Sequence, residues 1–329
     1  MAVPNMAFQT YQSVGNREDL EDVIYQISPV ETPFMTMAGR KTATATYHEW
    51  QTDVLGAATA NRQVEGDDAS GGTSVATRRL GNYCQISSKY AVVTDTENAI
   101  DKAGRGSEMS YQIAKRLGEL KRDMEFALTQ AQASVAGTAS AARSSAGIES
   151  WICFTTGVVT VGNGTSIGAG SNQTTPGYVS GAFSGPTDST TTATFTVTPL
   201  KHVIANCWTS GGNPGVIMVG GTQKQVVSTF TGIATLYREA GSTAKGTAIV
   251  GAADIYISDF GEHRIVPNRF SRNRTALVLD MDYWSVAYLR KVSQKEIART
   301  GGSEKRFIDV EFTLVAENPN SSGKVADLT

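Results

Sequence analysis

One long amphipathic helix constrains this chain more than any other feature of its sequence. Gly104 and Gly106 interrupt the preceding segment, and Ser107 can then cap free helix amides. Glu108 favours the positive end of a helix dipole, so a helix is predicted from Ser107 to about Val135, roughly 40 Å long at about 1.5 Å per residue. One apolar stripe follows it at steps of four and three residues, formed by Ile113, Leu117, Leu120, Met124, Ala127 and Ala131. An ordinary core helix would show the same stripe. The neighbouring segments therefore decide whether this helix is the long support against which other elements pack.

The composition is that of a folded chain with no strong overall charge. With 329 residues, of which 40% are apolar and 18% charged, it can bury a core in roughly two domain-sized units. Its net charge of -2 gives no global basic field for nucleic acid or a membrane surface. No basic region followed by an apolar core opens the sequence, and no run of 18 apolar residues occurs. We therefore expect neither export by a signal peptide nor insertion into a membrane.

Residues with catalytic or metal-binding potential are few and scattered. The cysteines Cys84, Cys153 and Cys207 form no CxxC pair and no disulfide set, and we expect them to be reduced and buried. The three histidines fall in different segments, and no phosphate-binding loop, HExxH or GxSxG motif is present. The sequence therefore predicts no enzyme, no cofactor and no metal site.

The first 40 residues are polar and punctuated by prolines. A short helix is expected over 19–27, ending before Pro29. Such a segment buries little by itself, so it is either a frayed terminus or an arm that packs on another subunit.

One long hairpin is predicted from Thr42 to about Thr94. Its limbs are TATATYHEW and YCQISSKYAVV, the second alternating apolar and polar residues. The polar, glycine-rich stretch between them carries Glu65, Asp67 and Asp68 at an acidic tip, which we interpret as a solvated turn and not a calcium loop. A ribbon this long is at best marginally stable alone, so it needs a partner surface in its own domain or on a neighbour.

The segment 155–197 contains a single charged residue, Asp188, among many Gly, Ser and Thr. It is either a flexible linker or an insertion of short strands such as GVVTV and ATFTVT, and its β-branched content slightly favours strands.

A second α+β unit begins at Thr198. Thr198 and Pro199 suit the start of a helix whose apolar face includes Leu200 and Ile204, and Gly211 ends it. A helix is expected in TQKQVVSTF, and strands in NPGVIMVGG, ADIYISDF, TALVLDMD, YWSVAYL and KRFIDVEFTLVAEN. The fold class is therefore α+β, with few, long helices and long ribbons.

One basic cluster stands out in GEHRIVPNRFSRNR, formed by His263, Arg264, Arg269, Arg272 and Arg274. These side chains could contact phosphates or pair with acidic groups of a neighbouring subunit. We favour the neighbour, because only Phe270 could stack on a base.

Taken together, these segments resemble the major capsid proteins of tailed bacteriophages, which have the Hong Kong 97-type fold, and in particular the family typified by the phage SU-ten. The resemblance covers most of the chain outside 155–197. The residues that carry it are SPVETPF at 28–34, GRGSEMSYQIAKRLGELKRDMEFAL at 104–128, the Gly147-Ile148 and Trp151-Ile152 pairs, SDFG at 258–261, IVPNRF at 265–270, LVLDMDYWSVAYLR at 277–290, ARTGGSEKRFIDVEFTL at 298–314 and GKVADL at 323–328.

The resemblance implies a division of the chain and a set of partners. Its segments would be an N-arm (1–40), an extended loop (41–94), a peripheral domain (95–154) with a spine helix over 107–136, an insertion (155–197), an axial domain (198–290) and a C-terminal strand returning to the peripheral domain (291–329). The subunit would assemble as pentamers and hexamers into an icosahedral virion capsid in the host bacterial cytoplasm. Partners would be a scaffolding protein, a portal protein, packaged double-stranded DNA and possibly a decoration protein, but no membrane. The scaffolding protein would be a separate chain, because the arm lacks the long extension that serves as a built-in scaffold in some members.

Two other functions remain open at this point. An encapsulin-like nanocompartment would share the fold and package protein cargo, although the C-terminal series favours a virus. A β-rich surface adhesin would suit segment 155–197 but conflicts with the missing signal peptide.

Overall fold

The structure is a computed structural model, and it describes most of the chain. The described residues are 31–53, 55–66, 76–102, 104, 106–152, 163–166, 186, 188, 192–230, 254–299 and 301–329. The helix expected over 19–27, Cys153, Asp67 and Asp68 lie outside them.

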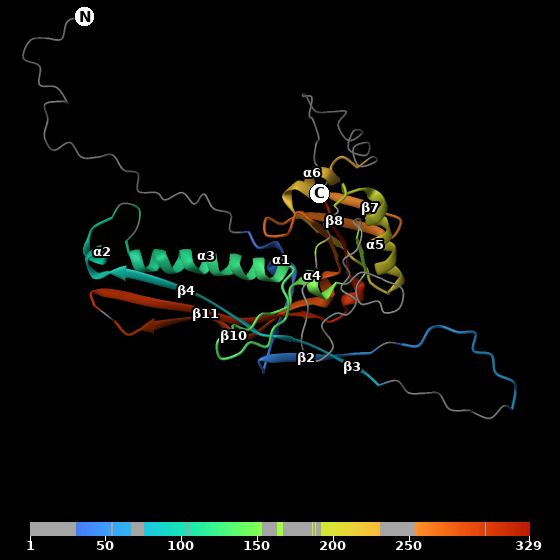
Figure 1. Cartoon of the computed structure of the whole chain (residues 1–329), viewed down its shortest axis with the longest axis horizontal. Helices are drawn as coiled ribbons and strands as arrows, with labels where there is room; N and C mark the ends of the chain where they lie inside the picture. The colour runs from blue at the N-terminus through green and yellow to red at the C-terminus, as the bar shows by residue number, and fades with distance from the viewer. Residues whose placement is uncertain are drawn as a thin grey trace, which may run out of the picture.

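A four-stranded sheet forms the elongated part of the molecule (Figure 1). Its strands lie in the order β1 (Gly39–Thr42), β10 (Trp284–Ile297), β11 (Ser303–Ala316) and β4 (Gln85–Thr94). β10 and β11 form a long antiparallel hairpin, β4 pairs antiparallel with β11, and β1 runs parallel to β10. We call this the long sheet. The short helix α2 (Asp95–Ala99) follows β4, and its first turn is capped by the Thr94 hydroxyl.

The predicted long helix is α3 (Glu108–Thr129), which lies along one face of the long sheet (Figure 1). Ser107 caps it as expected, with its hydroxyl accepting from the Ser110 amide at 3.4 Å. Leu120, Met124 and Ala127 of the stripe are buried. The prediction of a helix to about Val135 is wrong, because the chain becomes extended at Gln130 and Val135 instead pairs with Ser144. Val135 exchanges backbone hydrogen bonds with Ser144, and the Gln132 carbonyl accepts from the Gly147 amide, so the chain doubles back instead of continuing the helix.

The ribbon is shorter than predicted, and its second limb is a different segment. β2 (Tyr47–Thr52) pairs with β3 (Arg78–Tyr83), whereas the predicted second limb becomes β4 in the long sheet. β4 joins that sheet because its Ala91 and Val93 are buried against Met109 of α3. The ribbon and residues 55–66 beyond β2 extend away from both sheets (Figure 1).

A six-stranded sheet, the second sheet, forms the rest of the molecule. Its order is β5 (Asn163–Ser166), β12 (Gly323–Ala326), β9 (Thr275–Leu279), β6 (Val216–Val219), β8 (Gly261–Pro267) and β7 (Ile255–Ser258). Helices α5 (Val197–Thr209) and α6 (Gly221–Val227) pack into a core on one face. α5 starts one residue before the predicted Thr198, without a side-chain cap.

The expected boundaries at 155–197 and 290 are only partly reflected in these sheets. β5, from the Gly/Thr-rich insertion, pairs with β12, so this part of the insertion is a strand. The boundary at 290 cuts through β10, all of which belongs to the long sheet. Of the C-terminal segment 291–329, β11 lies in the long sheet and β12 pairs with β9 in the second sheet.

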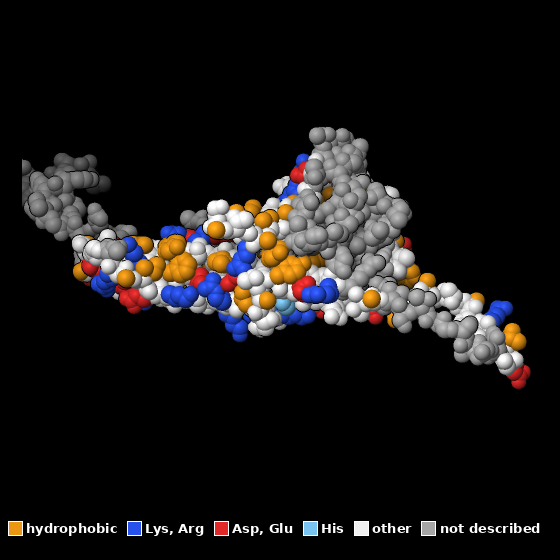
Figure 2. Space-filling view, turned by 60° about the horizontal axis from the view of Figure 1, so that its bottom comes forward, with side chains coloured by type: hydrophobic (Ala, Val, Ile, Leu, Met, Phe, Trp, Pro, Cys, Tyr) orange, Lys and Arg blue, Asp and Glu red, His pale blue; other side chains and the backbone are white. Residues whose placement is uncertain are grey.

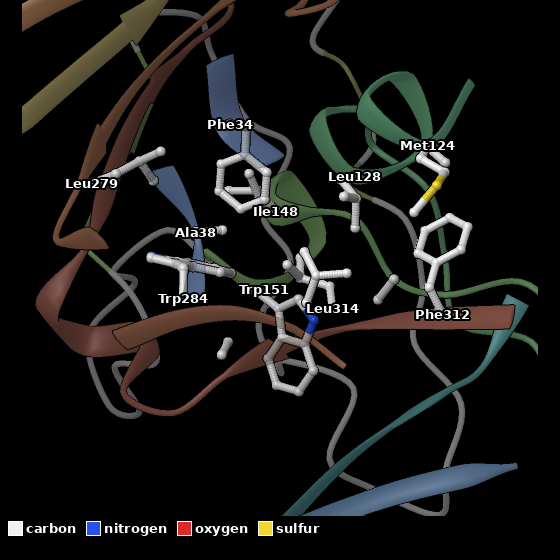
Figure 3. Close-up of a cluster of buried hydrophobic side chains, with 14 of the residues drawn as sticks. Phe34, Ala38, Met124, Leu128, Ile148, Trp151, Leu279, Trp284, Phe312 and Leu314 are labelled. Carbon is white, nitrogen blue, oxygen red and sulfur yellow. The ribbon is translucent and has the colours of Figure 1, made fainter. Parts of the chain in front are cut away.

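One apolar core joins the two sheets (Figure 3). Helix α1 (Pro33–Met37) inserts Phe34, whose ring meets Trp284 edge-on at 6.5 Å. Met218, Leu277 and Leu279 of the second sheet pack into the same cluster as Phe312 of the long sheet. Helix α4 (Ile148–Trp151) and the 3-10 turns η2 (Met281–Tyr283) and η3 (Pro319–Ser321) complete the connections.

Candidate assembly surface

The predicted basic cluster separates into buried and exposed groups. His263 is buried, and its Nδ1 donates to the Pro214 carbonyl at 2.5 Å. A carbonyl can only accept, so Nε2 accepts from the Ser258 hydroxyl at 2.7 Å. Burial lowers the pKa of His263, partly offset by the Pro214 hydrogen bond. His263 is therefore a neutral structural side chain and no part of a cationic surface.

Two of the four arginines are engaged within the chain. Arg272 Nη1 donates to Glu149 Oε2 at 2.9 Å, and its other amino group pairs with Asp188 of the insertion. Arg274 Nη2 donates to Asp327 Oδ1 at 3.4 Å. Glu149 and Asp327 are buried, so these pairs bind α4 and the last strand to the β8–β9 turn.

Arg264 and Arg269 are exposed and remain candidates for contact with another molecule. Arg264 borders a groove of about 330 Å³ that is also lined by Met37. Arg269 borders a second groove, of about 500 Å³, that is also lined by Asn273. Glu31 and Pro33 line both grooves, so the two arginines flank the base of the N-terminal segment.

Of the acidic residues expected at the ribbon tip, only Glu65 is among the described residues. Glu65 is exposed in a turn. Leu55 and Val64, which both lie between the end of β2 and Glu65, are 94% and 76% exposed. These large apolar side chains, on a thin projection with no core of its own, are candidates for contact with another molecule.

A further apolar surface, which the sequence did not single out, lies on the long sheet. Lys89 pairs with Asp123 of α3 at 2.6 Å, so the residues that alternate with it on β4 face away from the helix. They are joined by Phe307 of β11, whose ring lies 4.9 Å from that of Tyr90. Figure 2 shows apolar side chains among Lys and Arg along the elongated part of the molecule. We call the following residues the outer sheet face: Ile86, Tyr90, Val92 and Phe307.

An ionic cluster borders the outer sheet face. Arg290 donates to Asp309 at 2.5 Å and to Glu311 at 2.9 Å, and Arg143 donates to Glu311 at 2.5 Å. Burial alone would raise the pKa of Asp309, but hydrogen bonds from Ser293 and Lys295 and the charge of Arg290 hold it below its usual value. The cluster is thus anchored within the subunit. Nearby Cys84 is free and buried, and burial and Glu311 raise its thiol pKa to about 11.

Comparison with known proteins assigns the chain to a family. The profile of the SU10 major capsid protein family matches residues 5–329. The chain belongs to this family. The major capsid protein of Escherichia phage Phieco32 is similar to this capsid protein, with 27% identity over 349 residues, 98% of this chain and 97% of the relative. The chain is therefore a major capsid protein of a tailed bacteriophage.

Solved capsids share the fold of this capsid protein at much lower identity. The capsid of cyanophage A-1(L) has a TM-score of 0.62 at 12% identity, covering 98% of both chains. The native GTA particle capsid gives 0.63 at 7% identity, covering 99% of this chain and all of the other. The mature capsid of bacteriophage PhiM1 gives 0.59 at 9% identity. The α+β fold of the Hong Kong 97 type is confirmed.

The described helices of this capsid protein include none that is long and apolar enough to cross a membrane. Its described His, Cys, Asp and Glu side chains also form no group of three placed to hold a metal ion.

Proposed function

We propose that this capsid protein assembles with identical copies, as pentamers and hexamers, into a closed icosahedral shell around double-stranded DNA. Assembly takes place in the host cytoplasm with a scaffolding protein and a portal protein. The ribbon carries this proposal, because Leu55 and Val64 are 94% and 76% exposed on an element that cannot be stable by itself. A neighbouring subunit supplies the missing cover.

The parts of the chain take different places in such a shell. The long sheet and α3 form the peripheral domain, and the second sheet with α5 and α6 forms the axial domain near the capsomer centre. Residues 1–40 act as the arm, the ribbon as the extended loop, and the segment 155–197 faces outward. The outer sheet face and the ribbon each contact a different surface on a neighbouring copy. Such head-to-tail contacts close a set of subunits into a ring when the rotation from one copy to the next permits.

Arg264 and Arg269 serve contacts between subunits. Both are exposed beside the base of the arm, where Glu31 already places an acidic group. Acidic groups of a neighbour, such as Glu65, Asp67 and Asp68 at a ribbon tip, complement them. Contact with packaged DNA is the alternative for the same two side chains.

Electron microscopy of the purified protein, alone and co-expressed with the adjacent phage genes, tests this proposal. We expect uniform polyhedral particles, or pentamers and hexamers that become particles when the scaffolding protein is present. A persistent monomer or small dimer under both conditions would contradict the shell assignment. Particles that enclose a specific protein cargo instead of scaffolding protein or DNA would point to a nanocompartment.

A further inference from the structure

The base of the arm is a helix too short to hold itself. α1 has only five residues, and a single turn is far below the length at which a helix is stable in water. Its N-cap residue, Thr32, makes no side-chain capping hydrogen bond. The first amides of α1 therefore need an acceptor from elsewhere in the fold.

Glu125 of α3 supplies that acceptor. Its Oε1 accepts from the Phe34 amide at 2.8 Å, and its Oε2 accepts from the Met35 amide at 2.9 Å. The two residues are 91 and 90 positions away in sequence. Glu125 is 0% exposed, so water cannot replace it at this place. A buried carboxylate of the spine helix thus caps the helix at the base of the arm.

The same carboxylate also reaches the second sheet. Asn268, which follows β8, donates its Nδ2 to Glu125 Oε1 at 2.7 Å. The orientation of this amide is fixed, because its Oδ1 accepts from the Phe270 amide at 2.9 Å. The backbone amide of Asn268 donates to the Val219 carbonyl at 2.9 Å, and this hydrogen bond holds the turn after β8 against β6. Glu125 is therefore the point at which α1, α3 and the second sheet meet.

The chemistry of this junction requires an acceptor at both oxygens. Burial raises the pKa of Glu125, whereas the two amides and the Asn268 side chain act against that rise. All three partners are neutral N–H donors that keep their protons at any ordinary pH. A side-chain amide in place of the carboxylate would turn an NH₂ group toward one of these N–H donors. The NH₂ group and the donor that it faces would then both lack an acceptor.

We propose that Glu125 is a positioning residue that fixes the direction in which the arm leaves the subunit and couples that direction to the placement of the second sheet. The Phe34 ring keeps α1 in the core, and Glu125 sets its orientation there. The consequence for assembly rests on the proposed function, since a misdirected arm cannot reach its place on a neighbouring copy. The orientation of α1 itself is a property of the single subunit.

Hydrogen exchange of the unassembled full-length subunit tests the capping step. In Glu125→Gln, we expect the segment 31–38 to lose protection by about tenfold or more, while β10 and β11 keep theirs. Glu119→Gln is the matched control, because Glu119 lies on the same helix but only pairs with Arg116 near the surface. Unchanged protection of 31–38 in Glu125→Gln, or equal loss in Glu119→Gln, would overturn the proposal.

A local rescue separates positioning from simple capping. Thr32→Asp in the Glu125→Gln background provides a capping carboxylate at the start of α1 itself. We expect protection of 31–38 to return while closed shells stay rare by electron microscopy. Shells restored to the wild-type yield would show that any cap suffices and would overturn the coupling. If wild-type protein forms no shells either, the proposed function fails. The hydrogen-exchange result still tests the capping of α1, because it is measured on the unassembled subunit.

Discussion

Phe34 and Phe126 carry the same side chain in opposite surroundings, one fully buried and one 55% exposed. Phe34 fills the core between the two sheets beside Trp284, so Phe34→Ala leaves a cavity where α1, the long sheet and the second sheet meet. We expect a loss of about 3–5 kcal/mol in unfolding free energy, measured by urea denaturation of the unassembled subunit. Phe126→Ala removes the same atoms from the surface and should cost less than about 1 kcal/mol. Equal costs would contradict the placement of α1 in the core.

Arg272 and Arg269 are a second pair of like side chains with different roles. Arg272→Ala would leave Glu149 without its guanidinium partner, and we expect about 3–5 kcal/mol of destabilisation. Burial already raises the pKa of Glu149, and Lys324 and Arg272 oppose that rise, so loss of Arg272 should raise the pKa further. Arg269→Ala should leave the melting temperature of the subunit nearly unchanged. If Arg272→Ala melts like Arg269→Ala, the buried pair does not contribute to stability.

At the scale of elements, α4 approaches the end of α3 so closely that only glycine fits between them. A Cβ at Gly147 would lie 2.1 Å from the Gln130 carbonyl oxygen, at the point where α3 ends. Gly147 has a φ of -80°, which any residue can adopt, so a substitution fails for lack of space alone. Gly147→Ala should lower the unfolding free energy by about 1–3 kcal/mol or more. Gly215→Ala is the control, since a Cβ added at Gly215 would meet no atom within 4 Å.

Element by element, the sequence predicts local features well and partners poorly. Ser107 and the stripe through Leu120 and Met124 define the start and buried face of α3, because caps and periodicity act within a few residues. The end of α3 depends on Val135 meeting Ser144, and the ribbon's limbs depend on β4 pairing with β11. The pairing of β4 with β11, which are far apart in sequence, has no local signal.

The candidate site follows the same physical rule. The clustering of Arg264, Arg269, Arg272 and Arg274 is visible in the sequence, but Glu149 lies 123 residues from the arginine it binds. Only the fold separates engaged from exposed arginines. The outer sheet face escaped notice because alternation along β4 shows that two faces differ, and not which of them meets α3.

At the scale of the whole molecule, the shared core makes the two sheets one body from which the ribbon projects. Capsid proteins with only 7–12% identity keep the same fold, which fits a core specified by apolar pattern more than by particular residues. Residues exposed in the single subunit are free to differ, except where a neighbour covers them. The ribbon tip is the clearest place to test for such cover.

Replacing Leu55 and Val64 together by serine should leave the subunit intact and prevent shells. Both side chains are already exposed in the subunit, so we expect its unfolding free energy to change by less than about 0.5 kcal/mol. In a shell each buried side chain contributes about 1.5–3 kcal/mol, and the loss is repeated at every copy. Ala57→Ser with Ala60→Ser is the control, since it adds hydroxyls to the same exposed loop without removing large apolar groups. Particle yield by electron microscopy should fall at least tenfold for the first variant only. Normal shells from the Leu55→Ser, Val64→Ser variant would show that these two side chains make no essential contact.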